Sequence, residues 1–185
     1  MPKYRRNFQQ GGTYFFTVVT DSRARILCSD LARSCLRQAV KSCQKRWPFE
    51  SLAWVLLDDH LHSIWALPEG DDAYSLRWSW IKKEFTKAYL AAGGKEQSIS
   101  ASKRLRRERG VWQRRFWEHT LKDDRDLARH MDYIHYNPVK HKLVSCPKDY
   151  PYSSFHRWVK AGVYEQNWAC LEGLDFADLV GTVGE

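Results

Sequence analysis

The 185-residue sequence has no apolar run approaching the roughly 20 residues that a membrane-spanning helix needs. Its basic residues 1–6 are followed by no apolar segment, so the pattern of a secretory signal peptide is missing too. Internal repeats and a second domain are also absent from the pattern. The sequence therefore predicts a cytoplasmic protein built as one domain.

Cysteine pairs of the Cys-x-x-Cys type are missing as well. The odd number of cysteines predicts free thiols, as expected in a cytoplasmic protein. A structural zinc site of Cys and His is disfavoured, because no two ligand pairs have the required spacing. The five cysteines are Cys28, Cys35, Cys43, Cys146 and Cys170.

Acidic residues are in the minority. The chain has 22 Asp and Glu against 30 Lys and Arg, which gives a net charge of +8 and a pI of about 9.3. This excess favours a polyanionic partner, since phosphate contacts release counterions, although a basic protein without such a partner has the same composition. Nine Trp and nine Tyr offer faces on which unpaired bases can stack, but we expect most of these rings in the core.

Hydrophobic periodicity predicts elements in the order β-α-β-β-α-β-α. This order is typical of an α+β fold of the ferredoxin-like split βαβ type. Such a fold has an antiparallel sheet with helices on one side, and here one further helix follows. The expected strands cover residues 13–20, 49–57, 60–67 and 115–121, and the expected helices cover residues 29–46, 75–90 and 123–137.

Helix starts are predicted from side chains that can accept a bond from the first free backbone N–H groups. The expected N-caps are Ser29 or Asp30, Ser75, and Asp123 or Asp124.

Two segments interrupt the periodicity. Residues 93–110 combine a Gly-Gly pair with serines and a basic run, so we expect a mobile loop that either contacts DNA or is an inert insertion. We divide the chain into a domain of residues 1–150 and a C-terminal extension of residues 151–185 packed on it. The extension is expected to pack through aromatic residues, and from residue 171 it becomes an acidic, loosely held tail.

His60 and His62 lie two residues apart in an expected strand, so both side chains point to the same face. Two imidazoles on one face can hold a divalent metal. A bare His-x-His is more often a pair of surface or packing residues, so this motif needs support from elsewhere in the chain.

The last expected helix carries Tyr133. At about 100° per residue, His130, Tyr133 and Asn137 fall on one polar stripe beside the apolar stripe of Met131 and Ile134. A tyrosine there can face a cleft and attack a phosphate that a metal polarises. Alternatively, it can pack its ring against the core and expose its hydroxyl to solvent. Pro138 is expected to end this helix near Asn137.

Several blocks of the sequence resemble the REP-associated tyrosine transposases, a branch of the single-tyrosine HUH transposases that act on single-stranded DNA. Their order and spacing extend over almost the whole chain, to Trp168, and this combination is far more specific than the histidine pair alone. The matching blocks are residues 4–6, 11–17, 60–62, 67–72, 81–85, 115–119 and 130–141.

The resemblance implies an enzyme that cuts and rejoins single-stranded DNA at hairpins formed by repetitive extragenic palindromes. His60 and His62 match the metal ligands of the family, Tyr133 its nucleophile and Asn137 its polar metal-assisting residue. The implied ion is Mg²⁺ or Mn²⁺, and the implied intermediate is a 5′-phosphotyrosine with a free 3′-OH. No nucleotide cofactor is expected, because the bond energy is kept for rejoining. A non-catalytic DNA-binding protein that retains the fold is the alternative.

Some positions depart from the family or compete for a role. Asp58 and Asp59 stand where many relatives have proline, and either could supplement the metal or shape a turn. Lys142 replaces a frequent glycine. Tyr136 is a rival nucleophile about 60° around the helix from Tyr133. Related mobile transposases are dimers with shared active sites. We expect a monomer here, because the extension can cover that dimer surface.

Backbone contacts to the DNA are expected from basic side chains in three parts of the chain. Trp112 and Trp117 are candidates for stacking a base, and core packing is favoured for Trp117. These contacts would make the protein nucleoid-associated. The candidate DNA-binding residues are Lys3, Arg5, Arg6, Lys82, Lys83, Arg114 and Arg115.

Overall fold

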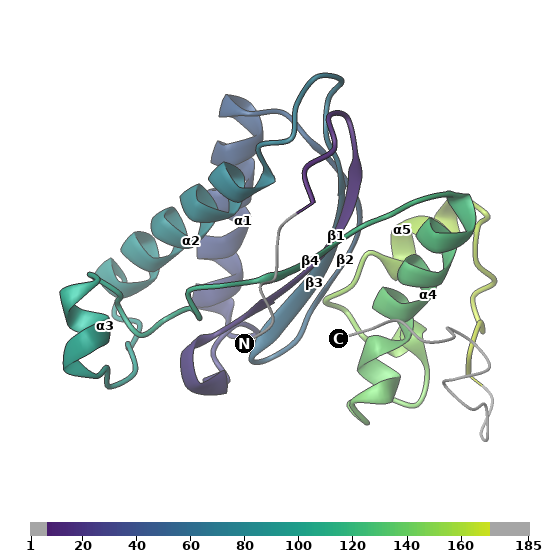
Figure 1. Cartoon of the computed structure of the whole chain (residues 1–185). Helices are drawn as coiled ribbons and strands as arrows, with labels where there is room; N and C mark the ends of the chain where they lie inside the picture. The colour runs from purple at the N-terminus through teal and green to yellow at the C-terminus, as the bar shows by residue number, and fades with distance from the viewer. Residues whose placement is uncertain (1–6, 171–185) are drawn as a thin grey trace.

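The structure is a computed structural model that describes residues 7–170. A four-stranded antiparallel sheet with strand order β2-β3-β1-β4 forms its centre (Figure 1). The strands are β1 (Thr13–Val19), β2 (Glu50–Leu56), β3 (His60–Ala66) and β4 (Trp117–Thr120). The helices are α1 (Asp30–Arg46), α2 (Tyr74–Ala91), α3 (Ala101–Leu105), α4 (Asp124–Lys140) and α5 (Phe155–Lys160), with 3-10 turns η1 (Asp21–Arg23) and η2 (Pro147–Asp149).

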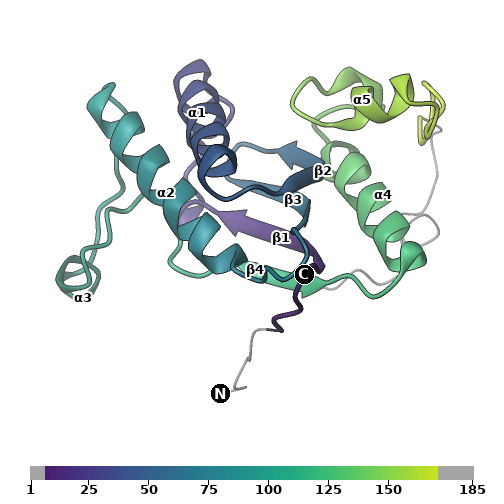
Figure 2. The same ribbon diagram turned by 90° about the horizontal axis from the view of Figure 1, so that it is seen from above.

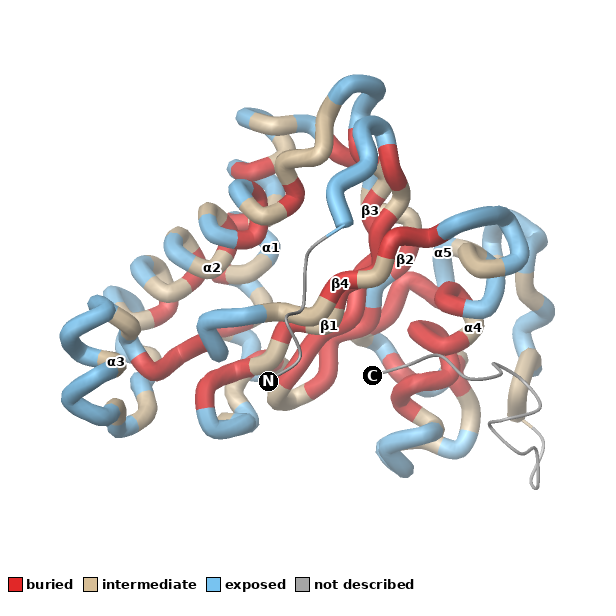
Figure 3. The backbone as a smooth tube through the Cα atoms, viewed as in Figure 1, coloured by how far each residue is buried: buried red, intermediate tan, exposed pale blue. Residues whose placement is uncertain are grey.

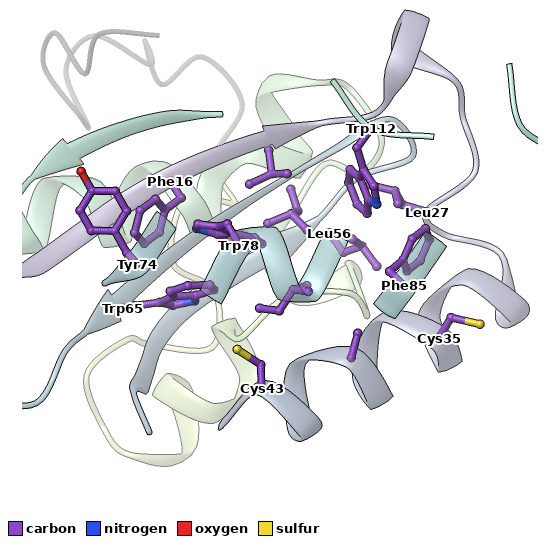
Figure 4. Close-up of a cluster of buried hydrophobic side chains, with 14 of the residues drawn as sticks. Phe16, Leu27, Cys35, Cys43, Leu56, Trp65, Tyr74, Trp78, Phe85 and Trp112 are labelled. Carbon is purple, nitrogen blue, oxygen red and sulfur yellow. The ribbon is translucent and has the colours of Figure 1, made fainter. Parts of the chain in front are cut away.

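Helices cover both faces of the sheet. Helices α1 and α2 pack on one face, and α4 packs on the other with α5 beside it (Figure 2). The α1/α2 side holds the larger core, where Phe16, Trp65 and Trp78 meet (Figure 4). A second core, which includes Phe15 and Ile64, lies under α4. This arrangement confirms the predicted ferredoxin-like α+β fold. Within residues 7–170, no helix has the length and apolar character of a membrane span.

Two of the three predicted caps are confirmed. The Ser29 side chain accepts from the Ala32 backbone N–H at the start of α1, and Asp123 accepts from Asp126 N at 2.8 Å at the start of α4. The cap predicted at Ser75 is wrong, because α2 begins one residue earlier, at Tyr74. Asp71 organises that turn instead by accepting from Ala73 N at 2.8 Å.

Helix α4 continues one turn further than predicted. Pro138 lies inside the helix, which runs to Lys140 and closes with a bond from His141 N to Asn137 O at 3.0 Å. Proline disfavours helical geometry at the preceding residue without forbidding it, and here Asn137 and Pro138 are both buried. Asn137 is therefore an interior helical residue with a fixed position relative to the rest of α4.

The prediction of a loop at residues 93–110 missed a short helix in that segment. The segment contains α3, whose cap Ser100 accepts from Lys103 N at 3.3 Å. Lys103 Nζ also pairs with the buried carboxylate of Asp21 at 2.5 Å. Gln97 N donates to Gly110 O at 2.9 Å and joins the two ends of the segment. These contacts join residues far apart in sequence, which local periodicity does not reveal.

Two cysteines are paired, contrary to the prediction of free thiols. A disulfide links Cys146 and Cys170, whose Cα atoms are 4.5 Å apart, while Cys28, Cys35 and Cys43 are free. Local sequence patterns do not reveal this pair, because the two residues are 24 positions apart and meet only when the chain after α5 folds back.

The extension lies against β2 and α4. Ser154 N donates to Trp54 O at 2.9 Å. The rings of Phe155, Tyr164 and Trp168 pack on one another, with 4.8 Å between the centroids of the last two. The division at residue 150 stays a prediction, and the tail expected from residue 171 lies outside the described residues.

Candidate active site

His60 and His62 lie on β3 and share its α4-facing side, with their ring centroids 5.0 Å apart. Both are buried: 4% of His60 and none of His62 is exposed. Leu61 and Trp65 point to the opposite core, so the predicted alternation along the strand is confirmed. His60 Nδ1 lies 2.6 Å from Asp59 Oδ1, which leaves Nε2 as the ring atom for a ligand.

One ring nitrogen of His62 makes no hydrogen bond within residues 7–170. Its Nδ1 is 2.9 Å from Thr17 Oγ1, and its buried Nε2 has no hydrogen-bond partner within residues 7–170. Burial, followed by the positive charges of His60, Lys140 and His141, holds the pKa of His62 well below 6.5. The ring is therefore neutral at pH 7. With its proton on Nδ1 it donates to Thr17, and Nε2 carries the free lone pair.

Tyr133 projects from α4 onto the histidine side of the sheet. Its ring lies edge-on to His62, with centroids 5.2 Å apart, and it also packs edge-on to Phe15 at 5.8 Å. The residue is fully buried. Lys140 Nζ donates to Tyr133 Oη at 3.2 Å and lies 4.8 Å from the ring centroid. Because Lys140 is exposed, the phenol end of Tyr133 faces the outer side of the site.

Asn137 lies one helical turn after Tyr133 and is also fully buried. Neither its Oδ1 nor its Nδ2 has a hydrogen-bond partner in the part of the chain that the structure describes. An unsatisfied buried polar group costs about 1–3 kcal/mol, so this amide does not contribute to folding through hydrogen bonds. The amide is available to a ligand.

These side chains fit a divalent cation. His62 Nε2 and Asn137 Oδ1 are buried acceptors without partners, and His60 Nε2 is the remaining ring nitrogen of the other histidine. The bond from His60 to Asp59 is the carboxylate–histidine pairing that orients metal-binding imidazoles. Asp59 thus acts through His60, whereas Asp58 pairs with Arg25 at 2.6 Å. We regard the three acceptor atoms as the candidate metal ligands.

The candidate DNA-binding residues do not gather around this site. Lys3, Arg5 and Arg6 lie outside the described residues. Lys82 and Lys83 project from α2, on the other face of the sheet, and Arg114 and Arg115 are exposed just before β4. Trp112 packs against Phe85 in the α1/α2 core, so it does not offer a face for base stacking (Figure 4). Trp117 packs edge-on to Phe15.

Sequence reasoning missed Lys140 as a hydrogen-bond partner of Tyr133. The spacing held a usable signal, because seven residues make almost two full helical turns and bring Tyr133 and Lys140 to the same face. The signal was hidden by the prediction that α4 ends near Asn137.

A second polar cluster joins β4 to the start of α4. His119 Nε2 lies 2.9 Å from Asp126 Oδ2, and His130 Nδ1 lies 2.8 Å from Asp126 O. The three residues have the side-chain types of a metal site, but their close atoms already bond to one another. Phe15 packs on both His130 and His62, with centroids 4.9 and 5.4 Å away. The cluster therefore holds α4 in place one turn before Tyr133.

Comparison with known proteins gives a consistent result. No protein-family model matches the sequence. A REP-associated tyrosine transposase of Escherichia coli strain K12 is 43% identical over 170 residues, which cover 91% of this chain and 92% of that protein. A Haemophilus influenzae protein with the same family name is 46% identical over 169 residues, 91% of this chain and 93% of that protein.

A solved structure resembles the whole fold. It is that of a REP-associated tyrosine transposase bound to a REP hairpin, and it matches 96% of both chains with a TM-score of 0.77 and 42% sequence identity. The relatives and this structure agree with the buried histidine–tyrosine arrangement in pointing to one group of proteins. The chain belongs to the family of REP-associated tyrosine transposases.

Proposed function

We propose that this protein cuts and rejoins single-stranded DNA beside a hairpin formed by a repetitive extragenic palindrome, with Tyr133 as the nucleophile. The observation that carries the proposal is the contact between the Tyr133 ring and His62, whose buried Nε2 has no partner within residues 7–170. The hairpin as substrate is supported by the solved relative, which is bound to one. The edge-on contact of the Tyr133 ring with His62 supports Tyr133 as the attacking residue.

In the proposed cleavage step, Tyr133 Oη attacks the scissile phosphorus and forms a new P–O bond. The bond from phosphorus to the 3′ oxygen breaks, so the downstream fragment stays on the enzyme through its 5′ phosphate as a 5′-phosphotyrosine, and the upstream fragment leaves with a 3′-OH. The phenol loses its proton and the leaving 3′ oxygen gains one, so protons balance. A 3′-OH that attacks the phosphotyrosine reverses these changes and rejoins a strand, which is why no nucleotide cofactor is needed.

The chain's own residues assist this step in two ways. A free phenol has a pKa near 10 and is a poor nucleophile at neutral pH, so its developing negative charge needs stabilisation. Lys140 Nζ, 3.2 Å from Tyr133 Oη, places a positive charge at that atom. His60, His62 and Asn137 would hold Mg²⁺ or Mn²⁺, which when bound supplies Lewis-acid polarisation of the phosphate.

The histidine ligands can be tested with labelled hairpin DNA taken from repeats beside the gene. His62→Ala should slow formation of the covalent protein–DNA adduct by about 100-fold or more while hairpin affinity changes little, because the histidine acts on the reacting phosphate. The matched control is His156→Ala, which removes an exposed histidine on α5 and should react like the wild type. Full activity of His62→Ala would refute the metal role.

The non-catalytic alternative makes a different prediction. If the chain only binds repeats, the wild type should bind the hairpin tightly but form no adduct with either Mg²⁺ or Mn²⁺. Chelation with EDTA should then leave all measured properties unchanged. In the account proposed here, EDTA abolishes the adduct and restored metal returns it. Gel filtration of the same sample tests the predicted monomer.

A further inference from the structure

A basic groove of about 670 Å³ lies between α2 and the chain that leads from α3 to β4. Glu108 is the one acidic residue among those that line it in the described chain, and it pairs with Arg106 at 2.8 Å. Helix α3 stands away from the sheet at one end of the molecule, and the chain around it is largely exposed (Figures 1 and 3). Residues 107–109, which follow α3, line the groove. Its cationic lining residues are Lys82, Lys83, Lys87, Arg107, Arg109 and Arg114.

Most of this positive charge is not neutralised inside the protein. Arg109 pairs with Glu96 at 2.8 Å. Lys82 donates to the backbone carbonyl of Gln113 at 2.9 Å. The four remaining cations of the groove have no acidic partner within residues 7–170. Four cations that converge on one groove without counter-charges repel one another, so the arrangement favours a polyanion. The four are Lys83, Lys87, Arg107 and Arg114.

The groove wall is a built structure. Lys103 of α3 forms an ion pair with Asp21. Gly110 has a left-handed backbone conformation, with φ 63°. A side chain at Gly110 would meet Gln97 O at 2.3 Å, so this close approach needs glycine. Arg107 also has a positive φ, 60°, which an arginine rarely adopts. This bend follows α3 directly and brings Arg107 to the groove.

The groove begins close to the candidate active site. Gln113, which lines it, donates from its backbone N to Val19 O at 2.9 Å, and Val19 pairs with His60 across β1 and β3. Two strand spacings, about 10 Å, therefore separate the backbones of Gln113 and His60. That is the rise of about three base pairs along a duplex axis. The exposed Arg114 follows at the edge between the two faces of the sheet.

We propose that this groove binds the sugar-phosphate backbone of the substrate DNA next to the cleavage position. The inference rests on the proposed function for its choice of ligand. Trp112, the aromatic residue of the lining, is 8% exposed and packs in the core, so the contacts go to phosphates and carry no base specificity. The backbone belongs either to the paired stem of the hairpin or to its unpaired flank.

The test compares a charge-reversed groove with an equally charge-reversed control. Lys87→Glu with Arg107→Glu changes the groove, and Lys41→Glu with Lys45→Glu makes the same charge change on exposed positions of α1. Affinity is measured by fluorescence anisotropy over a salt series for a thymidine oligonucleotide and for an unrelated duplex. A Lys87→Gln, Arg107→Gln variant removes the charges without adding acids, and circular dichroism checks that each variant is folded.

At 0.15 M salt we expect the reversed groove to bind DNA on the order of tenfold more weakly than the control variant. The slope of log affinity against log salt should fall by about 0.7 per lost contact for single strands and about 0.9 for duplex. A loss confined to the duplex assigns the groove to the stem, and a loss confined to the oligonucleotide assigns it to the flank. Equal affinities and slopes for the groove and control variants would overturn the proposal.

The proposed function is read separately, from the covalent adduct of the wild-type protein. If the wild type forms no adduct but groove-dependent binding persists, the nuclease assignment fails and the groove stands. If the adduct forms and the groove variants match the control, the groove proposal fails and the nuclease assignment stands.

Discussion

Replacement of Asn137 by leucine should make the protein more stable and less active. Its amide is fully buried, and neither polar atom has a partner within residues 7–170. Each unsatisfied group costs about 1–3 kcal/mol, and leucine has the same branching and the same number of side-chain heavy atoms without polar atoms, although its methyl groups are bulkier. Allowing for imperfect packing, we expect Asn137→Leu to raise the free energy of unfolding by about 1–3 kcal/mol in EDTA.

The assay is thermal and urea unfolding of wild type and variant, first in EDTA and then with Mn²⁺. A gain of 1 kcal/mol corresponds to about 2–4 °C in Tm for a chain of this size. Mn²⁺ should raise the Tm of the wild type more than that of the variant, because a ligand that binds more tightly stabilises the folded state more at the same concentration. The variant should also form the covalent adduct far more slowly.

Ser154→Ala is the contrasting control. Ser154 Oγ is buried with partners, since it accepts from Trp54 N at 2.8 Å and lies 3.0 Å from His135 Nε2. Its removal should therefore destabilise the protein by about 1–3 kcal/mol. If Asn137→Leu destabilises the metal-free protein to the same extent, the amide serves the fold, and the reasoning that it is kept for a ligand is refuted.

Two further predictions concern charged side chains. Lys140→Gln should slow adduct formation at saturating DNA by about 10- to 100-fold, because a charge-assisted bond to the reacting oxygen is worth about 1.5–3 kcal/mol. Lys160→Gln is the control, and equal rates for the two variants would contradict the role of Lys140. Asp71→Asn should destabilise the protein by about 3–5 kcal/mol in urea unfolding, because it leaves the buried Arg77, bonded at 2.9 and 2.6 Å, without its counter-charge. The bonds from Arg77 hold the pKa of Asp71 below 3.8 when folded. The ion pair therefore contributes its full stabilisation above pH 3.8, and this stabilisation is lost as the pH falls through the lower pKa of the folded state. Acid should thus lower the free energy of unfolding of the wild type more than that of Asp71→Asn. A loss under about 1 kcal/mol, or parallel acid titrations, would contradict this.

The parts of the fold and site that were predictable depend on local spacing. Period-two alternation placed His60 and His62 on one face, and helical periodicity placed Tyr133 and Asn137 one turn apart. Side-chain chemistry predicted the cap at Asp123. Each of these relations involves residues within about one turn or one strand of each other, so the sequence contains all the information.

The remaining features depend on contacts between distant segments. Lys103 meets Asp21 across 82 positions, and this contact orders a segment that by composition alone resembles a loop. The Cys146–Cys170 bond also forms only after the chain folds back. The missing partners of Asn137 are a property of its packed surroundings. Residue types and spacing predicted its role through the family resemblance, while its burial needed the structure.

The most direct test of the central claim is a denaturing gel of the protein incubated with Mn²⁺ or Mg²⁺ and end-labelled hairpin DNA. The account predicts a labelled protein band for the wild type and none for Tyr133→Phe, with hairpin binding unchanged in that variant because only the phenol oxygen is lost. Tyr136→Phe should retain the band. A band that persists in Tyr133→Phe and disappears in Tyr136→Phe would contradict the assignment of the nucleophile.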